Sequence, residues 1–392
     1  MITKETHKEN SFSVAKKQGG IYIHIPFCKQ ACHYCDFHFS TSLKRKEEMI
    51  MALLAEIKLR KEEFINETVA TIYFGGGTPS VLNTKEINTL INAVYKYYKV
   101  IENPEITLEA NPDDLTEERI IEIANSRVNR LSIGIQSFFE EDLKLMNRAH
   151  NAEESKKCLS IAIRYFDNIS IDLIFGMPNM STEKWQQNIN MALSFGIPHI
   201  SSYALTVEPK TALEKFIKNG EIEAPKDEVA EAHFHVLLEA LDKANFVHYE
   251  LSNFGKEGFF SENNSAYWKG KKYIGIGPSA HSFNGKERSW NITNNVKYIK
   301  SITEGILPNE VELLSKMDGY NEYVMTGLRT IWGVSLDKIK TDFGERYVTY
   351  LQKQSQKYVL EGMLFLEENV LKTTKKGKFL CDGIASDLFL LN

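Results

Sequence analysis

The sequence predicts an α/β fold, a partial (β/α)6 barrel followed by a smaller α+β part. Short β-branched, apolar runs alternate with helical patterns six times between residues 20 and 207. This alternation is typical of right-handed βαβ units in a parallel sheet. Polar or glycine residues interrupt these runs near their carboxyl ends, where the active sites of such barrels lie. Six units are fewer than the eight of a closed barrel, so we expect an open one.

The first strand is expected at residues 21–25, and Pro26 ends it because proline has no amide hydrogen to extend the ladder. Further strands are expected at 69–74, 106–110, 131–136, 169–175 and 200–207. Apolar residues at helical spacing predict helices at 44–64, 84–98, 117–125, 153–165 and 182–195. A long amphipathic helix at 226–245 follows Pro225.

The pattern changes after this helix. Residues 249–254, 263–268 and 273–283 are rich in aromatic residues and, in the last stretch, glycine, which predicts close-packed strands and turns that could cover the open barrel. From residue 316 the chain is expected to be helical to 332, at 336–340 and at 347–361, with a hairpin at 364–374. This order resembles a winged helix. We therefore divide the chain into a polar tail (1–19), the barrel (20–245), an α+β extension (246–315) and a winged-helix-like domain (316–392).

Composition narrows the classes of function. The net charge of −5 gives no basic face for nucleic acid, and residues 316–392 hold 11 Lys and Arg against 10 Asp and Glu. No apolar run approaches the ~18–20 residues of a membrane span. The first 19 residues are polar, without the apolar core of a signal peptide. Together with free cysteines, these features predict a cytoplasmic protein that binds no nucleic acid and has no transmembrane segment.

Three of the five cysteines stand directly after the first strand in a C-x3-C-x2-C pattern, at Cys28, Cys32 and Cys35. Thiolates hold iron–sulfur clusters, and three ligands on a cluster of four irons leave one iron open to a small molecule. A zinc ion is the alternative, with a fourth ligand from His24, His33 or His38. A disulfide is disfavoured, since three cysteines cannot pair among themselves and nothing marks secretion.

Polar residues and glycines interrupt the strands at positions that would share one rim of the barrel. They are Gly75–Thr78, Glu109, Gln136, Asp172 and Tyr203–Ala204. Each has a simpler interpretation by itself, as a turn, a cap or a satisfied core carboxylate. The two remaining cysteines, Cys158 and Cys381, stand alone and are expected to be packed small residues.

The cysteine motif, with Tyr34 before Cys35, resembles the signature of the radical S-adenosylmethionine (SAM) superfamily. The stretch Tyr22-Ile-His-Ile-Pro-Phe-Cys28 resembles the branch that holds the oxygen-independent coproporphyrinogen III oxidases and the heme chaperones called HemW. The resemblance implies a 4Fe-4S cluster on the three cysteines and SAM on its open iron. It also implies that the cofactor is lined by Tyr22, Tyr34, Gly76, Gly77, Thr78, Glu109, Gln136, Arg148, Asp172 and Ala204. Arg148 suits a carboxylate, although its simpler interpretation is a solvated helix end.

Two features favour the HemW-like branch. Phe37 stands where the oxidases carry a fourth cysteine, and the oxidases' longer N-terminal extension is missing. This resemblance implies a chaperone that binds heme and passes it to an acceptor protein, with flavodoxin or ferredoxin as reductant if the cluster is redox-active. The alternative is an oxygen-independent coproporphyrinogen III dehydrogenase. The branch's His-Asn-x-x-Tyr-Trp heme motif has Asn263 in place of its histidine here, so His281 and His248 are further candidates for the heme ligand.

Overall fold

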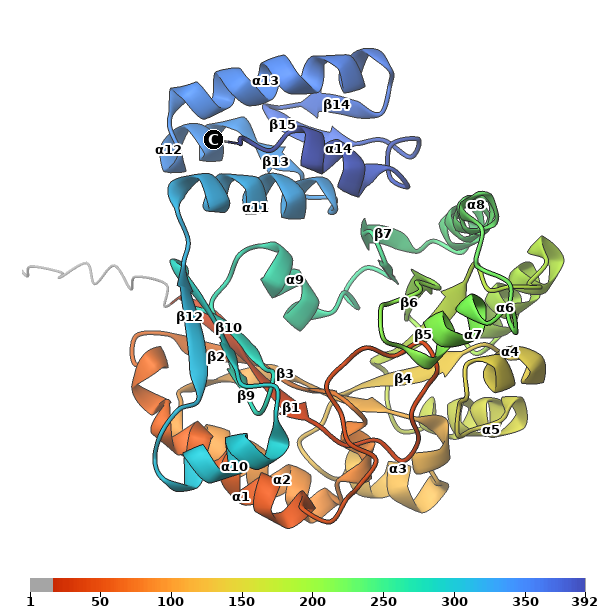
Figure 1. Ribbon diagram of the computed structural model, residues 1–392, viewed down its shortest axis with the longest axis vertical. Coiled ribbons are helices and arrows are strands. Elements are labelled where there is room, and N and C mark those ends of the chain that lie inside the picture. The colour runs from red at the N-terminus through yellow and green to blue at the C-terminus, as the bar shows by residue number, and fades with distance from the viewer. Residues whose placement is uncertain (1–16, 392) are drawn as a thin grey trace, which may run out of the picture.

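Six parallel strands form the centre of the molecule, as the alternating pattern predicts (Figure 1). The structure is a computed structural model that describes residues 17–391, so most of the predicted tail lies outside the described residues. The six strands are β1 (Gln18–Ile25), β2 (Thr68–Gly76), β3 (Val100–Ala110), β4 (Arg130–Gln136), β5 (Ile169–Phe175) and β6 (His199–Ala204). They pair in this order, each parallel to the next.

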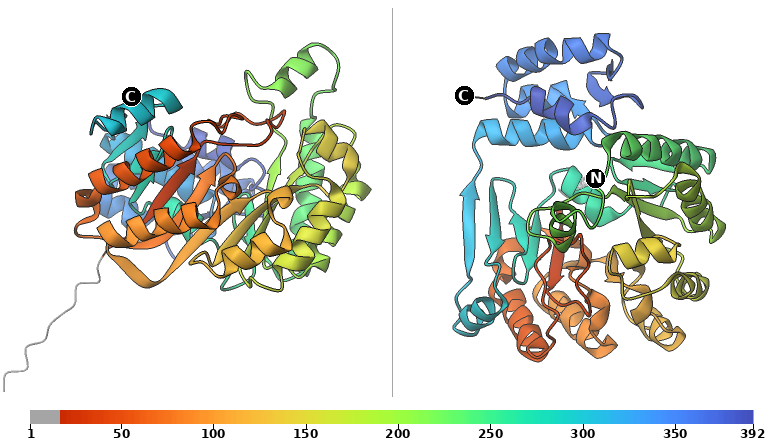
Figure 2. Two further views of the ribbon diagram at one scale, coloured as in Figure 1. Left: turned by 90° about the horizontal axis from the view of Figure 1, so that it is seen from below. Right: turned by 45° about the vertical axis from the view of Figure 1, so that its right-hand side comes forward.

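Helices connect these strands along the outer side of the sheet (Figures 1 and 2). They are α1 (Lys46–Leu59), α2 (Thr84–Tyr97), α3 (Glu117–Ala124), α4 (Glu140–Leu145), α5 (Ala152–Ala162) and α6 (Thr182–Ser194), with short 3-10 turns η1 (Lys61–Phe64), η2 (Pro79–Val81) and η3 (Pro112–Asp114). After β6 follow α7 (Ala212–Lys218), where the Leu213 N–H binds the His33 carbonyl oxygen on the loop after β1 at 2.8 Å, and α8 (Asp227–Lys243), which packs on α6. Local sequence fixes several starts: Asn83 and Asn151 each form a capping box with a glutamate three residues on.

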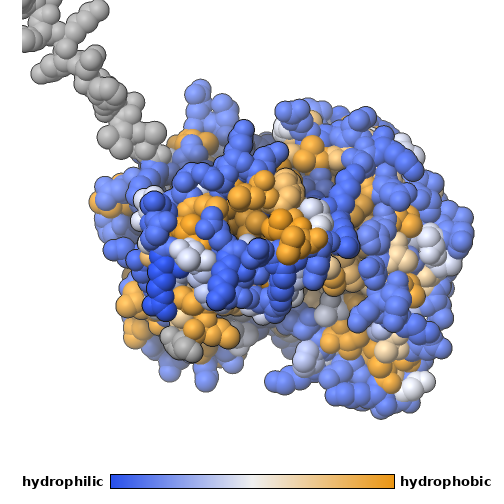
Figure 3. All heavy atoms as spheres, turned by 90° about the horizontal axis from the view of Figure 1, so that it is seen from above, coloured by the Kyte–Doolittle hydropathy of each residue, from blue (hydrophilic) through white to orange (hydrophobic). Residues whose placement is uncertain are grey.

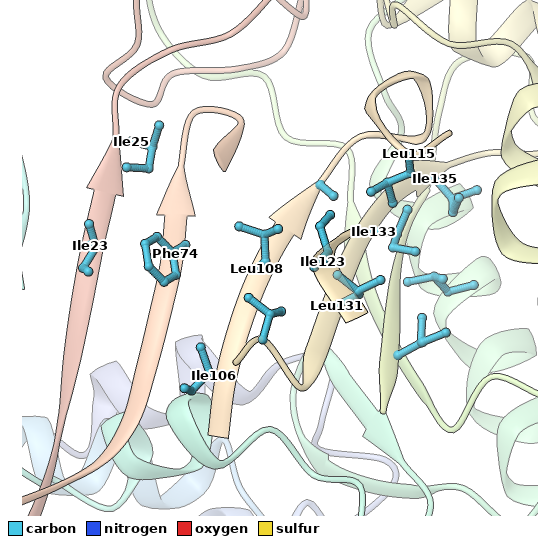
Figure 4. Close-up of a cluster of buried hydrophobic side chains, with 14 of the residues drawn as sticks. Ile23, Ile25, Phe74, Ile106, Leu108, Leu115, Ile123, Leu131, Ile133 and Ile135 are labelled. Carbon is cyan, nitrogen blue, oxygen red and sulfur yellow. The ribbon is translucent and has the colours of Figure 1, made fainter. Parts of the chain in front are cut away.

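The alternation along the strands separates the core from the barrel interior. Isoleucine, leucine and phenylalanine side chains face the helices and form the core, as Figure 4 shows for Ile23, Phe74 and Leu108. Because successive side chains of a strand point to opposite faces, the neighbouring Tyr22, Tyr73 and Glu109 face the interior of the barrel. The residues that interrupt the apolar runs are therefore those that line the interior.

The extension continues the same sheet at both edges, which differs from the expected cover over the opening. β9 (Tyr273–Ile276) lies parallel to β1 and leads to β10 (His281–Phe283), β11 (Glu287–Asn291) and β12 (Asn309–Leu313). At the other edge, β8 (Asn253–Gly255) and β7 (Val247–Glu250) follow β6. The sheet has 12 strands in all. Helix α10 (Asn295–Thr303) packs beside α1.

One prediction in the extension is wrong. Residues 263–268 were expected among strands and turns, but they form helix α9 (Glu262–Trp268). A residue distant in sequence stabilises the start of this helix: the Glu105 carboxylate accepts hydrogen bonds from the backbone N–H groups of Glu262 and Asn263 at 2.9 and 3.0 Å. A carboxylate at a helix N-terminus also compensates the helix dipole.

The C-terminal part has its own core and matches the predicted winged-helix order. It consists of α11 (Lys316–Leu328), β13 (Val334–Ser335), α12 (Leu336–Asp342), α13 (Glu345–Leu360), β14 (Leu364–Glu367), β15 (Val370–Thr373) and α14 (Cys381–Asp387). Viewed from above, apolar side chains gather in patches between polar ones (Figure 3), and Leu360 is 80% exposed. No helix between residues 17 and 391 is both long and apolar enough to cross a membrane.

The three boundaries between the four predicted parts remain predictions. The sheet runs through the proposed division at residue 245, and β1 begins at Gln18, inside the predicted tail. Cys158 is buried in the barrel core and Cys381 in the C-terminal core.

Candidate functional site

The cysteine loop joins β1 to α1 and is anchored at its start and near its middle. At its start, the backbone N–H groups of Gly77 and Thr78 bind the carbonyl oxygens of Ile25 and Phe27 at 2.9 and 2.7 Å. Further along, the N–H of His33 binds the Met146 carbonyl oxygen at 3.0 Å. These contacts hold the loop against the ends of β2 and of α4.

The three sulfurs are half-buried free thiols. Burial raises the pKa of Cys35 to about 11 and also raises the pKa of Cys28, which a hydrogen bond with Thr78 partly offsets. The Arg148 guanidinium donates to the Cys32 sulfur at 3.3 Å. The charge of Arg148 also lowers the pKa of Cys28, against the larger effect of burial.

The glycine motif is required by the fold around it. A Cβ atom at Gly77 would lie 2.6 Å from the Phe27 carbonyl oxygen, and one at Gly76, where φ is +106°, would lie 2.4 Å from the His24 ring. Any larger residue would push β2 away from the cysteine loop. The motif thus positions the loop, whatever contact it also makes with a ligand.

Two carboxyl groups face the barrel interior. The Tyr73 hydroxyl donates to Glu109 at 2.7 Å, and the Tyr73 ring stacks on Tyr22 with centroids 6.0 Å apart. Burial, with the charge of Asp172, raises the pKa of Glu109 to about 7. Burial likewise raises the pKa of Asp172 to about 6, against a hydrogen bond with Ser201. Two carboxyl groups short of water and of cationic partners suit a cationic ligand.

Arg148 is half-buried, and its guanidinium is held by protein groups, which differs from a solvated helix end. It follows the short helix α4, which sequence reasoning missed, and donates to Asn111 at 2.6 Å and to the Gly134 carbonyl oxygen at 3.0 Å. A Cβ atom at Gly134 would lie 3.1 Å from Arg148 and 3.2 Å from Gln136, so this glycine makes room for both side chains.

The residues fit the cofactors that the cysteine motif implies. Gln136 Oε1 and Arg148 Nε are buried without hydrogen-bond partners, so polar groups for a ligand remain beside the cysteine loop. A molecule with a carboxylate, an amine and a sulfonium would meet Arg148 and the two carboxyl groups with opposite charges. Across the described part of the chain, no three His, Cys, Asp or Glu side chains are placed to hold one metal ion.

The structure brings most of the predicted site residues to one region. Tyr22, Gly76–Thr78, Glu109, Gln136 and Asp172 come from five neighbouring strands. Tyr34 lies on the cysteine loop, where burial raises its pKa and Arg148 opposes the effect. Ala204 is exposed at the end of β6, at the far side of the group. Whether each contacts a cofactor remains a prediction.

Sequence reasoning missed Tyr73, Asn111 and Gly134. Tyr73 had a signal, because it alternates with the core residues Ile72 and Phe74. Asn111 stands two residues after Glu109 and was considered only as part of a cap. For Gly134 no local signal exists, since its role depends on a side chain 14 residues away.

The three candidate positions for a heme ligand differ in the exposure and the hydrogen bonding of their side chains. Asn263 is 2% exposed, and its side chain accepts a hydrogen bond from the Thr71 hydroxyl at 2.9 Å. Both ring nitrogens of His248 are engaged, one with the Leu251 carbonyl oxygen at 3.0 Å and one with Lys378 at 2.6 Å. His281 is exposed and forms no hydrogen bond with its ring within residues 17–391.

Comparisons with known proteins show which family this chain resembles. Residues 22–201 match the radical SAM superfamily, and residues 314–380 match the HemN C-terminal domain. The heme chaperone HemW of Lactococcus lactis is 31% identical over 385 residues, which cover 94% of this chain and 99% of that protein. HemW of Bacillus subtilis is also 31% identical, over 92% of this chain and 96% of its own length.

Among solved structures, the coproporphyrinogen III oxidase HemN from Escherichia coli, described as a radical SAM enzyme, has the same fold. Its TM-score is 0.83 at 22% identity, over 95% of this chain and 90% of that one. At this identity the likeness concerns the fold alone, and it confirms the partial barrel with its C-terminal parts. The identities to HemW extend along nearly the whole length of both chains, and the chain therefore belongs to the HemW family of the radical SAM superfamily.

Proposed function

We propose that this protein is a heme chaperone, which binds heme and passes it to an acceptor protein. The observation that carries the proposal is the 31% identity to the Lactococcus lactis heme chaperone over 94% of this chain and 99% of that one. The relationship therefore includes the barrel, the extension and the C-terminal domain together. The likeness to the oxidase HemN concerns the fold, and Phe37, where the oxidases are expected to carry a fourth cysteine, is 68% exposed.

We also propose that Cys28, Cys32 and Cys35 hold a 4Fe-4S cluster and that SAM binds beside it. When bound, these groups supply one-electron chemistry. The chain's own part is to hold and orient them: Arg148 would bind the carboxylate of SAM, while Glu109 and Asp172 would face its positive charges. The contacts of Gly77 and Thr78 with β1 keep the cysteine loop beside these groups.

The remaining parts of the proposal concern partners and place. A reductant such as flavodoxin or ferredoxin would supply electrons if the cluster works as a redox centre. Heme would leave to an acceptor protein in the cytoplasm. Free thiols in both hydrophobic cores and on the loop support a reducing compartment.

One anaerobic preparation tests the proposal. The purified chain is reconstituted with iron and sulfide, analysed for both, and titrated with hemin while the Soret band is recorded. We expect about four irons and four sulfides per chain, as a 4Fe-4S cluster requires, and a Soret shift that saturates at one heme. A chain that binds no heme at stoichiometric hemin would contradict the chaperone function, and one zinc per chain would contradict the cluster.

A further inference from the structure

The nine histidines of the described chain can be compared to find which of them could bind heme iron. Seven of the nine use a ring nitrogen in a hydrogen bond, and the two that do not are the exposed His235 and His281. His235 lies on helix α8, and its ring is 3.8 Å from Glu231. His281 lies on strand β10 of the large sheet. Only His281 therefore combines an accessible ring with a position on the barrel interior.

The strand register places His281 in the same row as Tyr22. Tyr22 pairs with Gly275 across β1 and β9, and Tyr273 pairs with Phe283 across β9 and β10. His281 therefore lies opposite Gly275, and a Cβ atom at Gly275 would lie 2.0 Å from the His281 carbonyl oxygen. Residues directly opposite one another on neighbouring strands project to the same face of a sheet. His281 and Tyr22 therefore point to the same side, and Gly275, which has no side chain, lies between them.

The side chains on this face of the sheet suit a flat aromatic ligand. The rings of His281 and Trp290 lie 6.0 Å apart, and in the next row Tyr273 lies 6.4 Å from Phe283. These aromatic side chains offer a porphyrin apolar surface and stacking partners. Arg288, beside this surface, forms a 2.9 Å ion pair with Glu322 of α11 and supplies a positive charge for carboxylate groups.

We infer that heme binds on this inner face of β1, β9, β10 and β11, over Gly275, with His281 as the ligand to its iron. The inference rests on the proposed chaperone function and assigns its binding site. Heme would then lie next to the cofactor site, with Tyr22 between the two. The position of Asn263, buried against Thr71, has no part in the ligation.

Hemin titration of the reconstituted full-length chain tests this assignment with three variants. His281→Ala removes the ligand, His281→Cys replaces imidazole by a thiolate, and His235→Ala is the matched control, since it removes the other exposed histidine. We expect His281→Ala to weaken heme binding on the order of tenfold or more and to shift the Soret band, with added imidazole restoring both. His281→Cys should give the spectrum of a thiolate-ligated heme, which a structural role of His281 would not produce.

The outcomes separate this inference from the proposed function. If the unmodified chain binds no heme, both fail. If it binds heme and His281→Ala keeps the same affinity and spectrum, only the ligand assignment is overturned, and the same holds if His235→Ala causes the loss. Iron and sulfide content and the circular dichroism spectrum check that each variant is folded. If His281→Ala is unstable, the spectrum of His281→Cys tests the ligand assignment instead: a thiolate-ligated heme supports it, and an unchanged spectrum overturns it.

Discussion

Replacing Glu109 by glutamine should stabilise the cofactor-free chain. The gain in free energy of unfolding over the unmodified chain should be larger at alkaline pH than at acidic pH. The pKa of Glu109 is about 7 in the folded protein, against 4.5 for an ordinary glutamate. One pKa unit corresponds to about 1.4 kcal/mol, so ionising this carboxyl costs the folded state about 3 kcal/mol. The side chain keeps some contact with solvent, which reduces the expected cost to about 2 kcal/mol.

The direction of the pH dependence follows from where the proton is lost. Below the unfolded pKa of 4.5 the carboxyl is protonated in both states, and the cost is absent. As the pH rises towards 7, the unfolded chain loses the proton first, so the stability of the unmodified protein falls, and above 7 the full cost is present. Glutamine stays neutral throughout and keeps an oxygen that can accept the hydrogen bond from Tyr73.

Urea unfolding of both chains at about pH 5 and about pH 8 measures the effect, and we expect the advantage of Glu109→Gln to grow by about 2 kcal/mol between them. Glu122→Gln is the control, because hydrogen bonds with Thr84 and Arg119 lower the pKa of this exposed glutamate and its replacement should give no such gain. An equal advantage of Glu109→Gln at both pH values would refute the idea that a desolvated carboxylate stands ready for a cation.

Three further predictions concern the loop and the heme motif. Alanine at any one of the three loop cysteines should abolish the brown cluster, whereas Cys158→Ala and Cys381→Ala should keep iron and sulfide at the level of the unmodified chain, because both lie in hydrophobic cores. Gly77→Ala should reduce cluster content after reconstitution with an unchanged circular dichroism spectrum, since its methyl group would lie 2.6 Å from a carbonyl oxygen of the loop; normal iron content would show that the loop tolerates the shift. Asn263→His restores the family motif but places a larger ring in a filled site beside Thr71. We therefore expect a loss of about 1–3 kcal/mol of stability and no gain in heme affinity. Tighter hemin binding would show that this position does contact the heme.

The sequence was sufficient for features that depend on neighbours along the chain. The strand from Ile169 to Phe175 was predicted with its observed bounds, and the cysteine loop was placed after the first strand, because strand alternation and the proline after β1 are local signals. The polar residues at the strand ends were found in the same way. They are conspicuous because the positions on either side of them are apolar.

Features that depend on distant contacts were not predictable in this way. The start of α9 depends on Glu105, more than 150 residues earlier, so its residues gave no clear helix signal. The inward position of the Arg148 side chain depends on Asn111 and on the space left by Gly134. The parallel pairing of β9 with β1 joins segments some 250 residues apart, and no local sequence pattern predicts this pairing. It is this pairing that creates the surface proposed for heme.

Strand β1 connects the core, the cofactor site and the proposed heme surface. Its odd residues, Ile21, Ile23 and Ile25, are almost completely buried against the helices, while Tyr22 and His24 face the interior. On one side β2 contributes the glycines that hold the cysteine loop, and on the other β9 contributes Gly275. A shift of one residue in the register of β1 would exchange the two faces and place tyrosine and histidine in the core. The requirement for a stable core therefore also determines which side chains of β1 face the interior of the barrel.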